Sequence, residues 1–328
     1  MTNEPVAGVR ASEARTRHFL SLKQLSPAQL AHVVRRSAAF AAAGRFPGRK
    51  PLADRTVGIF FRGSSTRTRT SFTVGAQKLG AQTLSYGPQD LQLATGETLE
   101  DTGRVLSCYL DALVIRTNSP QAEMEALARQ DRMAIINAMS AEEHPTQAIA
   151  DLSTLLEARG SLEGVHLLYL GEGNNSVTAL ANGFARIPGS RLTVVTPEGY
   201  GVPEALLAPA QETGRQNGSV IEQHHDVDDL PSNVDAVYAT RWQTMGVPKA
   251  DPDWRRSFLP YTVDQRIMER VSKPQGTIFL HDLPAVRGDD VTDEVLDGPQ
   301  SYAWRQAEHK MFGAMAVLEW CLGGEELP

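Results

Sequence analysis

The chain has 328 residues, of which 41% are hydrophobic and 22% are charged, with a formal net charge of −7 and a pI near 5.7. This length and apolar content are sufficient for about two domains, each with its own core. The acidic balance lacks the basic footprint of a nucleic-acid-binding protein, so we expect any bound anion to be small and held locally. Two cysteines, Cys108 and Cys321, are too few for a disulfide framework.

The beginning of the sequence and its longest apolar runs indicate where in the cell the protein is expected. Residues 1–14 are polar and differ from a signal peptide, which begins with positive charge and continues with an apolar segment. No run approaches the roughly 20 apolar residues of a membrane-spanning helix. We therefore expect a cytoplasmic protein that does not bind membranes.

Short apolar runs alternate with amphipathic segments along the first half of the chain. Ser26 followed by Pro27 predicts the start of a first helix. The expected strands are 56–61, 82–85, 112–116 and 133–137, and the expected helices are 67–79, 99–109, 121–129 and 145–158. Regular alternation of this kind predicts an α/β fold with a parallel sheet.

The alternation restarts after Gly160. Strands are expected at 165–170, 191–196, 219–223, 234–239 and 277–281, with a helix at 177–185. We therefore predict two doubly wound parallel-sheet domains, one over 1–150 and one over 151–301, joined by the helix that begins near His144. The remaining segment, 302–328, is apolar at near-helical spacing and is predicted to form a C-terminal helix that packs back on the first domain.

The segment 63–70, GSSTRTRT, lies between a predicted strand and a predicted helix. A helix N-terminus leaves its first amide donors unpaired and carries a partial positive charge, so it favours a bound anion. Arg67 can hold two phosphate oxygens in a fork, and the serine and threonine hydroxyls can donate to the others. The alternative is that Ser65 only caps the helix and the arginines are solvated.

Two further polar groups follow strands of the first half. His144 and Gln147 stand three residues apart at a helix start, so they share one face, where an imidazole can donate to a carbonyl oxygen and an amide can hold a small amide group. Arg116 also ends a strand, and ligands bind at the carboxyl ends of parallel strands. The alternatives are a capping or surface histidine and an arginine in a weakly stabilising surface ion pair.

The second half carries polar segments at its own strand ends. Residues 171–176, GEGNNS, match a dinucleotide-binding fingerprint in part, with Ser176 at the third glycine position. A Rossmann-like nucleotide-binding protein therefore remains an alternative. Asn174 and Asn175 offer amide groups suited to the carboxylate or amine of an amino acid. The segments 240–246 and 281–285 are expected to face the cleft between the domains.

Three motifs in this order resemble the carbamoyltransferases of ornithine and aspartate. The resemblance extends over about residues 18–322. S-T-R-T-R at 65–69 resembles the carbamoyl phosphate motif of this family, H-P-T-Q at 144–147 its H-P-x-Q motif, and H-D-L-P at 281–284 its H-x-L-P motif. The resemblance implies a homotrimer with shared active sites that uses neither a metal nor another cofactor.

The resemblance also implies roles for individual residues. Arg67, Arg116, His144 and Gln147 would be catalytic. Carbamoyl phosphate would be bound by Ser65, Thr66, Arg67, Thr68, Gln92, Arg116, His144, Gln147, Leu283 and Lys310. Within this set, Gln92 would reach the phosphate of a neighbouring subunit, and Gln147 would hold the carbamoyl nitrogen. Lys310 stands where ornithine enzymes have an arginine, so it keeps the charge but loses the planar fork.

The part of the sequence that would bind the acceptor departs from the ornithine pattern. Ornithine enzymes carry D-x-W-x-S-M-G and H-C-L-P, whereas this chain has Thr240 at the aspartate position and Asp282 at the cysteine position. Residues 240–243, TRWQ, instead resemble the T-R-x-Q of aspartate enzymes. The predicted acceptor site comprises Asn174, Asn175, Arg241, Gln243, Thr244, Met245 and Asp282.

The charge of Asp282 guides the choice of acceptor. A carboxylate favours a cation and repels the second carboxylate of an aspartate substrate. We predict transfer of the carbamoyl group to a primary amine of an amino acid, with 2,3-diaminopropionate or an ornithine-like diamino acid as acceptor and a ureido amino acid as product. The alternatives are an ornithine carbamoyltransferase, an aspartate carbamoyltransferase and a catalytically silent relative.

Overall fold

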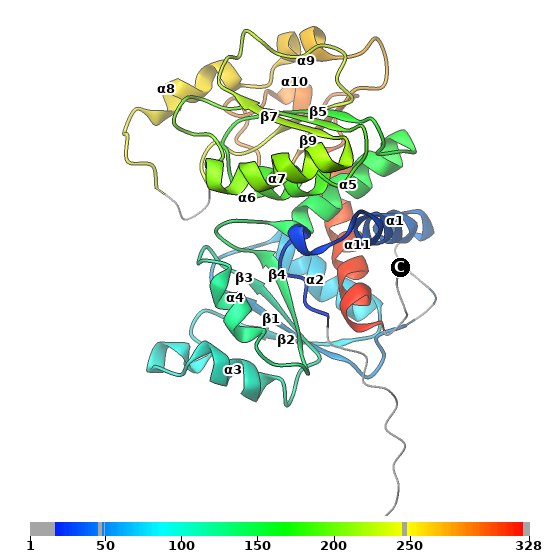
Figure 1. Ribbon diagram of the computed structural model, residues 1–328, viewed down its shortest axis with the longest axis vertical. Helices are drawn as coiled ribbons and strands as arrows, with labels where there is room; N and C mark the ends of the chain where they lie inside the picture. Colours follow the sequence, from blue (N-terminus) through cyan, green and yellow to red (C-terminus); the bar gives the residue numbers. More distant parts are fainter. Residues whose placement is uncertain (1–16, 45–47, 49, 245–247, 324–328) are drawn as a thin grey trace, which may run out of the picture.

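The computed structural model describes residues 17–44, 48, 50–244 and 248–323. The predicted acceptor residue Met245 and the polar segment 1–14 lie outside these residues. Two parallel sheets, each with helices packed against it, occupy the two ends of the elongated molecule (Figure 1). Among the described helices, none combines the length and apolar content needed to cross a membrane.

The first sheet has the strand order β2-β1-β3-β4, and all its neighbouring strands are parallel. Its strands are β1 (Thr56–Phe61), β2 (Gln82–Tyr86), β3 (Ala112–Arg116) and β4 (Ala134–Met139). The helical elements of this half are η1 (Leu22–Gln24), α1 (Pro27–Ala43), α2 (Arg67–Lys78), η2 (Gln92–Thr95), α3 (Leu99–Leu106) and α4 (Ala122–Leu127). Strands β1, β3 and β4 are buried along nearly their whole length, which explains their continuous apolar sequence.

The second sheet has the strand order β7-β6-β5-β8-β9 and is also parallel throughout. Its strands are β5 (His166–Leu170), β6 (Arg191–Val195), β7 (Val220–His224), β8 (Ala236–Ala239) and β9 (Ile278–His281). The helices are α6 (Asn175–Phe184), α7 (Glu204–Asn217), α8 (Trp254–Phe258), η3 (Leu259–Tyr261), α9 (Gln265–Val271) and α10 (Asp293–Leu296). The strand order reverses at β1 in the first sheet and at β5 in this one, which marks a ligand-binding edge in each.

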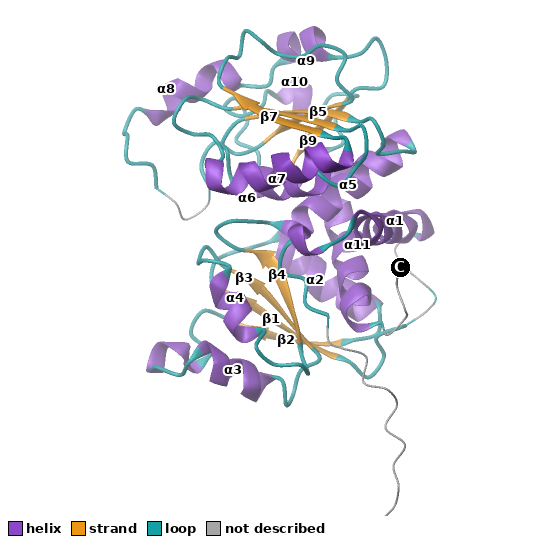
Figure 2. Ribbon diagram, viewed as in Figure 1, coloured by secondary structure: helices purple, strands orange, loops and turns teal. Residues whose placement is uncertain are grey.

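Helices α5 (Pro145–Arg159) and α11 (Ala303–Leu322) connect the two halves. Figure 2 shows them together with α1 in the region between the sheets. Helix α11 packs against α1, α2 and α5, with Met315 and Leu318 fully buried. The predicted α/β fold with two parallel sheets and a returning C-terminal helix is therefore confirmed.

Several predicted element boundaries are wrong by a few residues. Helix α6 begins at Asn175, two residues before the predicted start, because the Asn174 side chain accepts hydrogen bonds from the amides of Ser176 and Val177. Helix α3 ends at Leu106, three residues before the predicted end. The amide of Tyr109 instead bonds to the Leu106 carbonyl, which tightens this segment into a turn. Such local capping decides where a periodic segment stops.

Candidate active site

A cavity of about 290 Å³ lies where the carboxyl ends of strands from both sheets converge. Most of its lining residues end or follow β1, β3 and β4 of the first sheet and β5, β8 and β9 of the second, and Lys310 belongs to α11. The open ends of parallel sheets are where such folds bind ligands. The cavity therefore joins the predicted anion segment to the predicted acceptor segments in one site.

Most of the residues singled out from the sequence line this cavity. They are Ser65, Thr66, Arg67, Thr68, Arg116, His144, Gln147, Asn174, Asn175, Arg241, Gln243, Thr244, Asp282, Leu283 and Lys310. Gln92 is exposed and lies outside the lining, so its reach into a neighbouring subunit stays a prediction. The lining also includes Ser64, Met139, Ser176, Thr240 and Pro284, which were not among the predicted site residues.

The first turn of α2 lines the end of the cavity where the sequence predicts an anion site. Its N-cap residue is Thr66, and no side chain caps the helix amides, so the expected alternative of a Ser65 cap is wrong. Arg67 lines the cavity, and burial lowers the pKa of its guanidinium. Arg69 lies outside, with its guanidinium carbon 5.1 Å from the centre of the Phe61 ring. Only one of the two arginines is therefore available to a ligand in this cavity.

Arg116 and His144 lie next to each other in the cavity. Nη1 of Arg116 donates to Oγ1 of Thr68 at 3.2 Å and lies 3.2 Å from Nε2 of His144. A guanidinium only donates, so Nε2 of His144 is the acceptor here and Nδ1 carries the proton. Burial lowers the pKa of Arg116 to about 10. The alternatives of a surface ion pair and a surface histidine are therefore wrong, since His144 is only 5% exposed.

The protonation state of His144 follows from its surroundings. Burial, together with the positive charges of Lys310 and Arg116, holds the pKa of this imidazole well below its ordinary value. The side chain makes no capping hydrogen bond although it precedes α5. Within the described part of the chain, its buried Nδ1 has no hydrogen-bond partner. His144 therefore presents a neutral imidazole with one N–H group at neutral pH.

Replacing His144 with asparagine should change how stability depends on pH. The unfolded chain binds a proton at His144 near pH 6.5, whereas the folded chain does so only at much lower pH. Folding stability from this group is therefore lost as pH falls below about 6.5, by up to about 1.4 kcal/mol per pH unit. Urea unfolding between pH 7.5 and 5.0 should show that the free energy of unfolding falls less steeply with decreasing pH for His144→Asn than for the native chain. Equal slopes would contradict the assignment.

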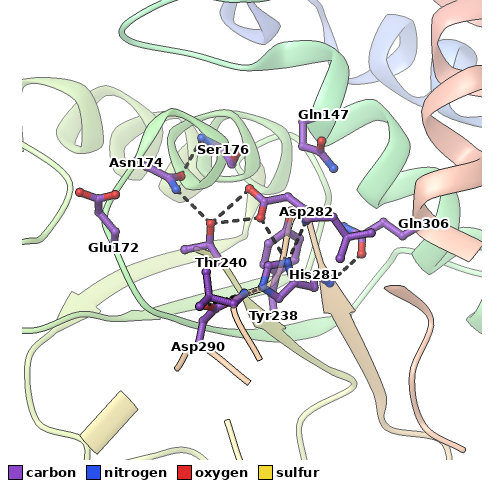
Figure 3. Close-up of polar contacts among 12 residues, drawn as sticks. Gln147, Glu172, Asn174, Ser176, Tyr238, Thr240, His281, Asp282, Asp290 and Gln306 are labelled. Atoms are coloured by element: carbon purple, nitrogen blue, oxygen red, sulfur yellow. Dashed lines mark hydrogen bonds and ion pairs between the residues drawn. The ribbon is translucent and has the colours of Figure 1, made fainter. Parts of the chain in front are cut away.

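Thr240 connects residues at the end of the cavity where the sequence predicts the acceptor site. Its Oγ1 donates to the Asp282 carboxylate, at 3.1 Å from Oδ1 and 3.2 Å from Oδ2, and accepts a hydrogen bond from Nδ2 of Asn174 at 3.0 Å (Figure 3). The amide of Asn175 donates to the Ser140 carbonyl at 2.7 Å. The amide nitrogens of both asparagines thus bond within the protein, which the sequence did not reveal.

A buried histidine stabilises the turn that carries Asp282 through hydrogen bonds. Nδ1 of His281 accepts from the amide of Leu283 at 2.8 Å. Its Nε2 lies 2.6 Å from Oδ2 of Asp290 (Figure 3). The Asp290 carboxylate also accepts from the amide of Val286. These bonds explain the histidine of the H-x-L-P segment as a structural group. Asp290 carried no sequence signal of its own.

Glu172 fixes the segment that follows β8. Its carboxylate accepts from the amide and hydroxyl of Thr244 at 2.8 and 2.9 Å, and it pairs with Lys249. The ammonium of Lys249 also lies 4.5 Å from the centre of the Tyr200 ring and 4.9 Å from that of Phe258. Thr244 is therefore held at the cavity by a charged group on a different strand end.

Comparisons with known proteins match both halves of the chain. The family model for the aspartate/ornithine carbamoyltransferase carbamoyl-P binding domain matches residues 17–157, and the model for the Asp/Orn binding domain matches residues 163–321. The chain belongs to the aspartate/ornithine carbamoyltransferase family. It is therefore a carbamoyltransferase, and the alternative of a nucleotide-binding protein without carbamoyl chemistry is not supported.

Individual relatives within the family match most of the chain. It is 38% identical to an ornithine carbamoyltransferase of Acidothermus cellulolyticus, over 95% of this chain and 99% of the relative. Among solved structures, the ornithine carbamoyltransferase from Pyrococcus furiosus superposes with a TM-score of 0.87 at 34% identity, covering 95% of this chain and 98% of that one. The enzyme from Gloeobacter violaceus gives 0.81 at 33% identity, covering 94% and 100%.

Proposed function

We propose that this carbamoyltransferase moves the carbamoyl group of carbamoyl phosphate to a side-chain amine of a diamino acid, yielding a ureido amino acid and phosphate. The observation that supports this most is the distribution of charge in the cavity. Asp282 is the only acidic residue among the described lining residues, and Arg67, Arg116, Arg241 and Lys310 line the same cavity. Such a site suits an anionic donor and an acceptor that brings both an ammonium and a carboxylate.

Carbamoyl phosphate would bind with its phosphate at the N-terminus of α2. The free amides of the first turn, the hydroxyls of residues 65, 66 and 68 and the guanidinium of Arg67 supply the donors that a phosphate needs. The carbonyl oxygen would then face Arg116 and His144, and the nitrogen would face Gln147. This orientation leaves the carbamoyl carbon open toward the acceptor end of the cavity.

The transfer itself follows from this arrangement. The neutral amine of the acceptor attacks the carbamoyl carbon, a C–N bond forms, and negative charge develops on the carbonyl oxygen. Arg116 and the N–H of neutral His144 stabilise that charge as fixed donors. The bond between the carbon and the phosphate oxygen then breaks, and the departing phosphate takes the proton released by the amine nitrogen. Holding both substrates together in one cavity supplies a further share of the acceleration.

Two acceptors within the diamino acids are candidates. Ornithine is favoured by the names of the relatives, which are ornithine carbamoyltransferases at 36–38% identity. A shorter diamino acid such as 2,3-diaminopropionate is favoured by the pairing of Thr240 with Asp282, which stand where ornithine enzymes carry aspartate and cysteine. In both cases Arg241 and Gln243 would bind the acceptor carboxylate, and Asp282 would bind an ammonium group.

The proposal also covers the oligomeric state and the role of each domain. We place carbamoyl phosphate binding in residues 1–150 and acceptor binding in residues 151–301. The enzyme would act as a cytoplasmic homotrimer without a cofactor. Gln92 of each subunit, which is exposed on η2, would complete the phosphate site of its neighbour.

A panel of acceptors tests the proposal. Release of phosphate from carbamoyl phosphate should be measured with ornithine, 2,4-diaminobutyrate, 2,3-diaminopropionate and L-aspartate. We expect one of the diamino acids to exceed aspartate in kcat/KM by about 100-fold or more, because Asp282 repels a second carboxylate. If kcat/KM is highest with ornithine, the first candidate is supported. If it is highest with 2,3-diaminopropionate, the second candidate is supported. Aspartate as the best acceptor, or inert diamino acids, would refute the proposal.

A further inference from the structure

Asp151 is a fully buried carboxylate directly behind the cavity. It lies on α5, one turn after Gln147, and its Oδ1 accepts from Nε2 of Gln147 at 2.7 Å. The same oxygen accepts from Nε2 of Gln306 at 2.6 Å, and Oδ2 accepts from the hydroxyl of Tyr238 at 3.3 Å. Asp151 does not line the cavity, so it acts on a ligand only through its neighbours.

These contacts determine which end of the Gln147 amide faces the ligand. Nε2 of Gln147 donates to Oδ1 of Asp151, so the NH₂ group of the amide points toward Asp151. The amide oxygen then points the other way, where Oε1 accepts from Nζ of Lys310 at the cavity wall. The two ends of the amide have similar size and shape, so its orientation is set by these two partners, the carboxylate of Asp151 at the NH₂ end and the ammonium of Lys310 at the oxygen end.

We propose that Asp151 is a positioning residue, which holds the oxygen of Gln147 toward the cavity so that the site selects the NH₂ group of carbamoyl phosphate over the methyl group of an acetyl phosphate. This inference rests on the proposed contact between Gln147 and the carbamoyl nitrogen. The two groups have nearly the same size, so shape alone discriminates poorly between them. A fixed acceptor oxygen forms a hydrogen bond with the N–H of carbamoyl phosphate. It has no partner when the methyl group of acetyl phosphate occupies the same place.

The surroundings of Asp151 make it a rigid support. Gln306 is on α11, and its Oε1 accepts from the amide of His281 at 2.8 Å, while Tyr238 belongs to β8 (Figure 3). The carboxylate thus ties Gln147 to both strands that border the acceptor end. Burial raises the pKa of Asp151, and the hydrogen bonds from Gln306 and Gln147 oppose that rise. Burial likewise lowers the pKa of Lys310.

The test compares the dissociation constants of carbamoyl phosphate and acetyl phosphate, measured by calorimetry without an acceptor. Asp151→Leu removes the acceptor of the Gln147 NH₂ group and leaves only Lys310 to orient the amide, so we expect the preference for carbamoyl phosphate to fall about tenfold. Asp151→Asn is the matched control. Its oxygen can still accept from both glutamines and its NH₂ can donate to Tyr238, so the preference should stay within about threefold of the native value.

Further variants keep the outcomes distinct. Asp151→Ala is measured alongside Asp151→Leu, in case the larger side chain prevents folding, and the same loss of preference is expected. Gln147→Leu removes the amide itself and should also lower the preference. If Gln147→Leu lowers it and the leucine and alanine variants of Asp151 do not, the positioning role is refuted. If Gln147→Leu leaves it unchanged, the proposed contact of Gln147 with the carbamoyl nitrogen is refuted, and the positioning role with it.

Discussion

Replacing Arg67 with alanine should lower kcat/KM for carbamoyl phosphate by about 1000-fold or more. The guanidinium lies at the N-terminus of α2, where it can grip two phosphate oxygens, and it adds positive charge beside Arg116 where the departing phosphate gains negative charge. Alanine retains the helix and the amides but removes both effects. The loss is measured as phosphate release and as formation of the ureido product.

Arg69 provides the matched control for this experiment. It belongs to the same helix and the same segment, but its side chain covers the Phe61 ring and lies outside the cavity lining. Arg69→Ala should therefore keep kcat/KM within a few fold of the native value. Arg67→Lys should fall between the two, because lysine keeps the charge and loses the fork. Equal losses for Arg67→Ala and Arg69→Ala would contradict the assignment of Arg67 to the phosphate.

Replacing Asp282 with asparagine should weaken the use of the diamino acid and strengthen the binding of carbamoyl phosphate. Asparagine can still accept the hydrogen bond from Thr240 but cannot attract an ammonium, so kcat/KM for the best diamino acid should fall about 100-fold. Burial lowers the pKa of both Arg67 and Arg116, and the negative charge of Asp282 acts on both guanidinium groups and offsets part of that lowering. Its removal strengthens the net positive field, so the dissociation constant of carbamoyl phosphate should decrease.

The opposite signs separate a charge effect from general damage to the site. Asp289→Asn serves as control, because Asp289 lies on the same loop but pairs with Arg255 away from the cavity. It should change neither substrate constant. Weaker binding of both substrates to Asp282→Asn would indicate a disturbed turn rather than a lost charge, and unchanged use of the diamino acid would refute the role of Asp282 in acceptor binding.

The α/β fold and the general position of the site follow from local patterns in the sequence. Apolar strands alternate with amphipathic helices, and polar segments stand at the strand ends where parallel sheets bind ligands. The segment 63–70 shows this clearly, because a strand, a turn of hydroxyls and arginines and a helix N-terminus are all local features. Motif order and spacing likewise sufficed to indicate the family, which the comparisons confirm.

The roles of the polar side chains at the start of α6 were less predictable. Asn174 appeared in the sequence as a ligand group, but its oxygen caps α6 and its nitrogen bonds to Thr240. The amide nitrogen of Asn175 is likewise bonded to the Ser140 carbonyl. A polar side chain at a helix start can serve either the backbone or a ligand, and the choice depends on how the chain enters the helix.

The sequence by itself determined the strand and helix pattern and the polar groups gathered at one sheet edge, because both depend on residues close together in the chain. Only the tertiary structure decided how these groups pair. Lys310 bonds to Gln147 across 163 residues, Gln306 to Asp151 across 155, and Thr240 to Asp282 across 42. These contacts arise where α5, α11 and the second sheet meet, and no periodicity or spacing in one sequence specifies the distance between side chains on separate elements.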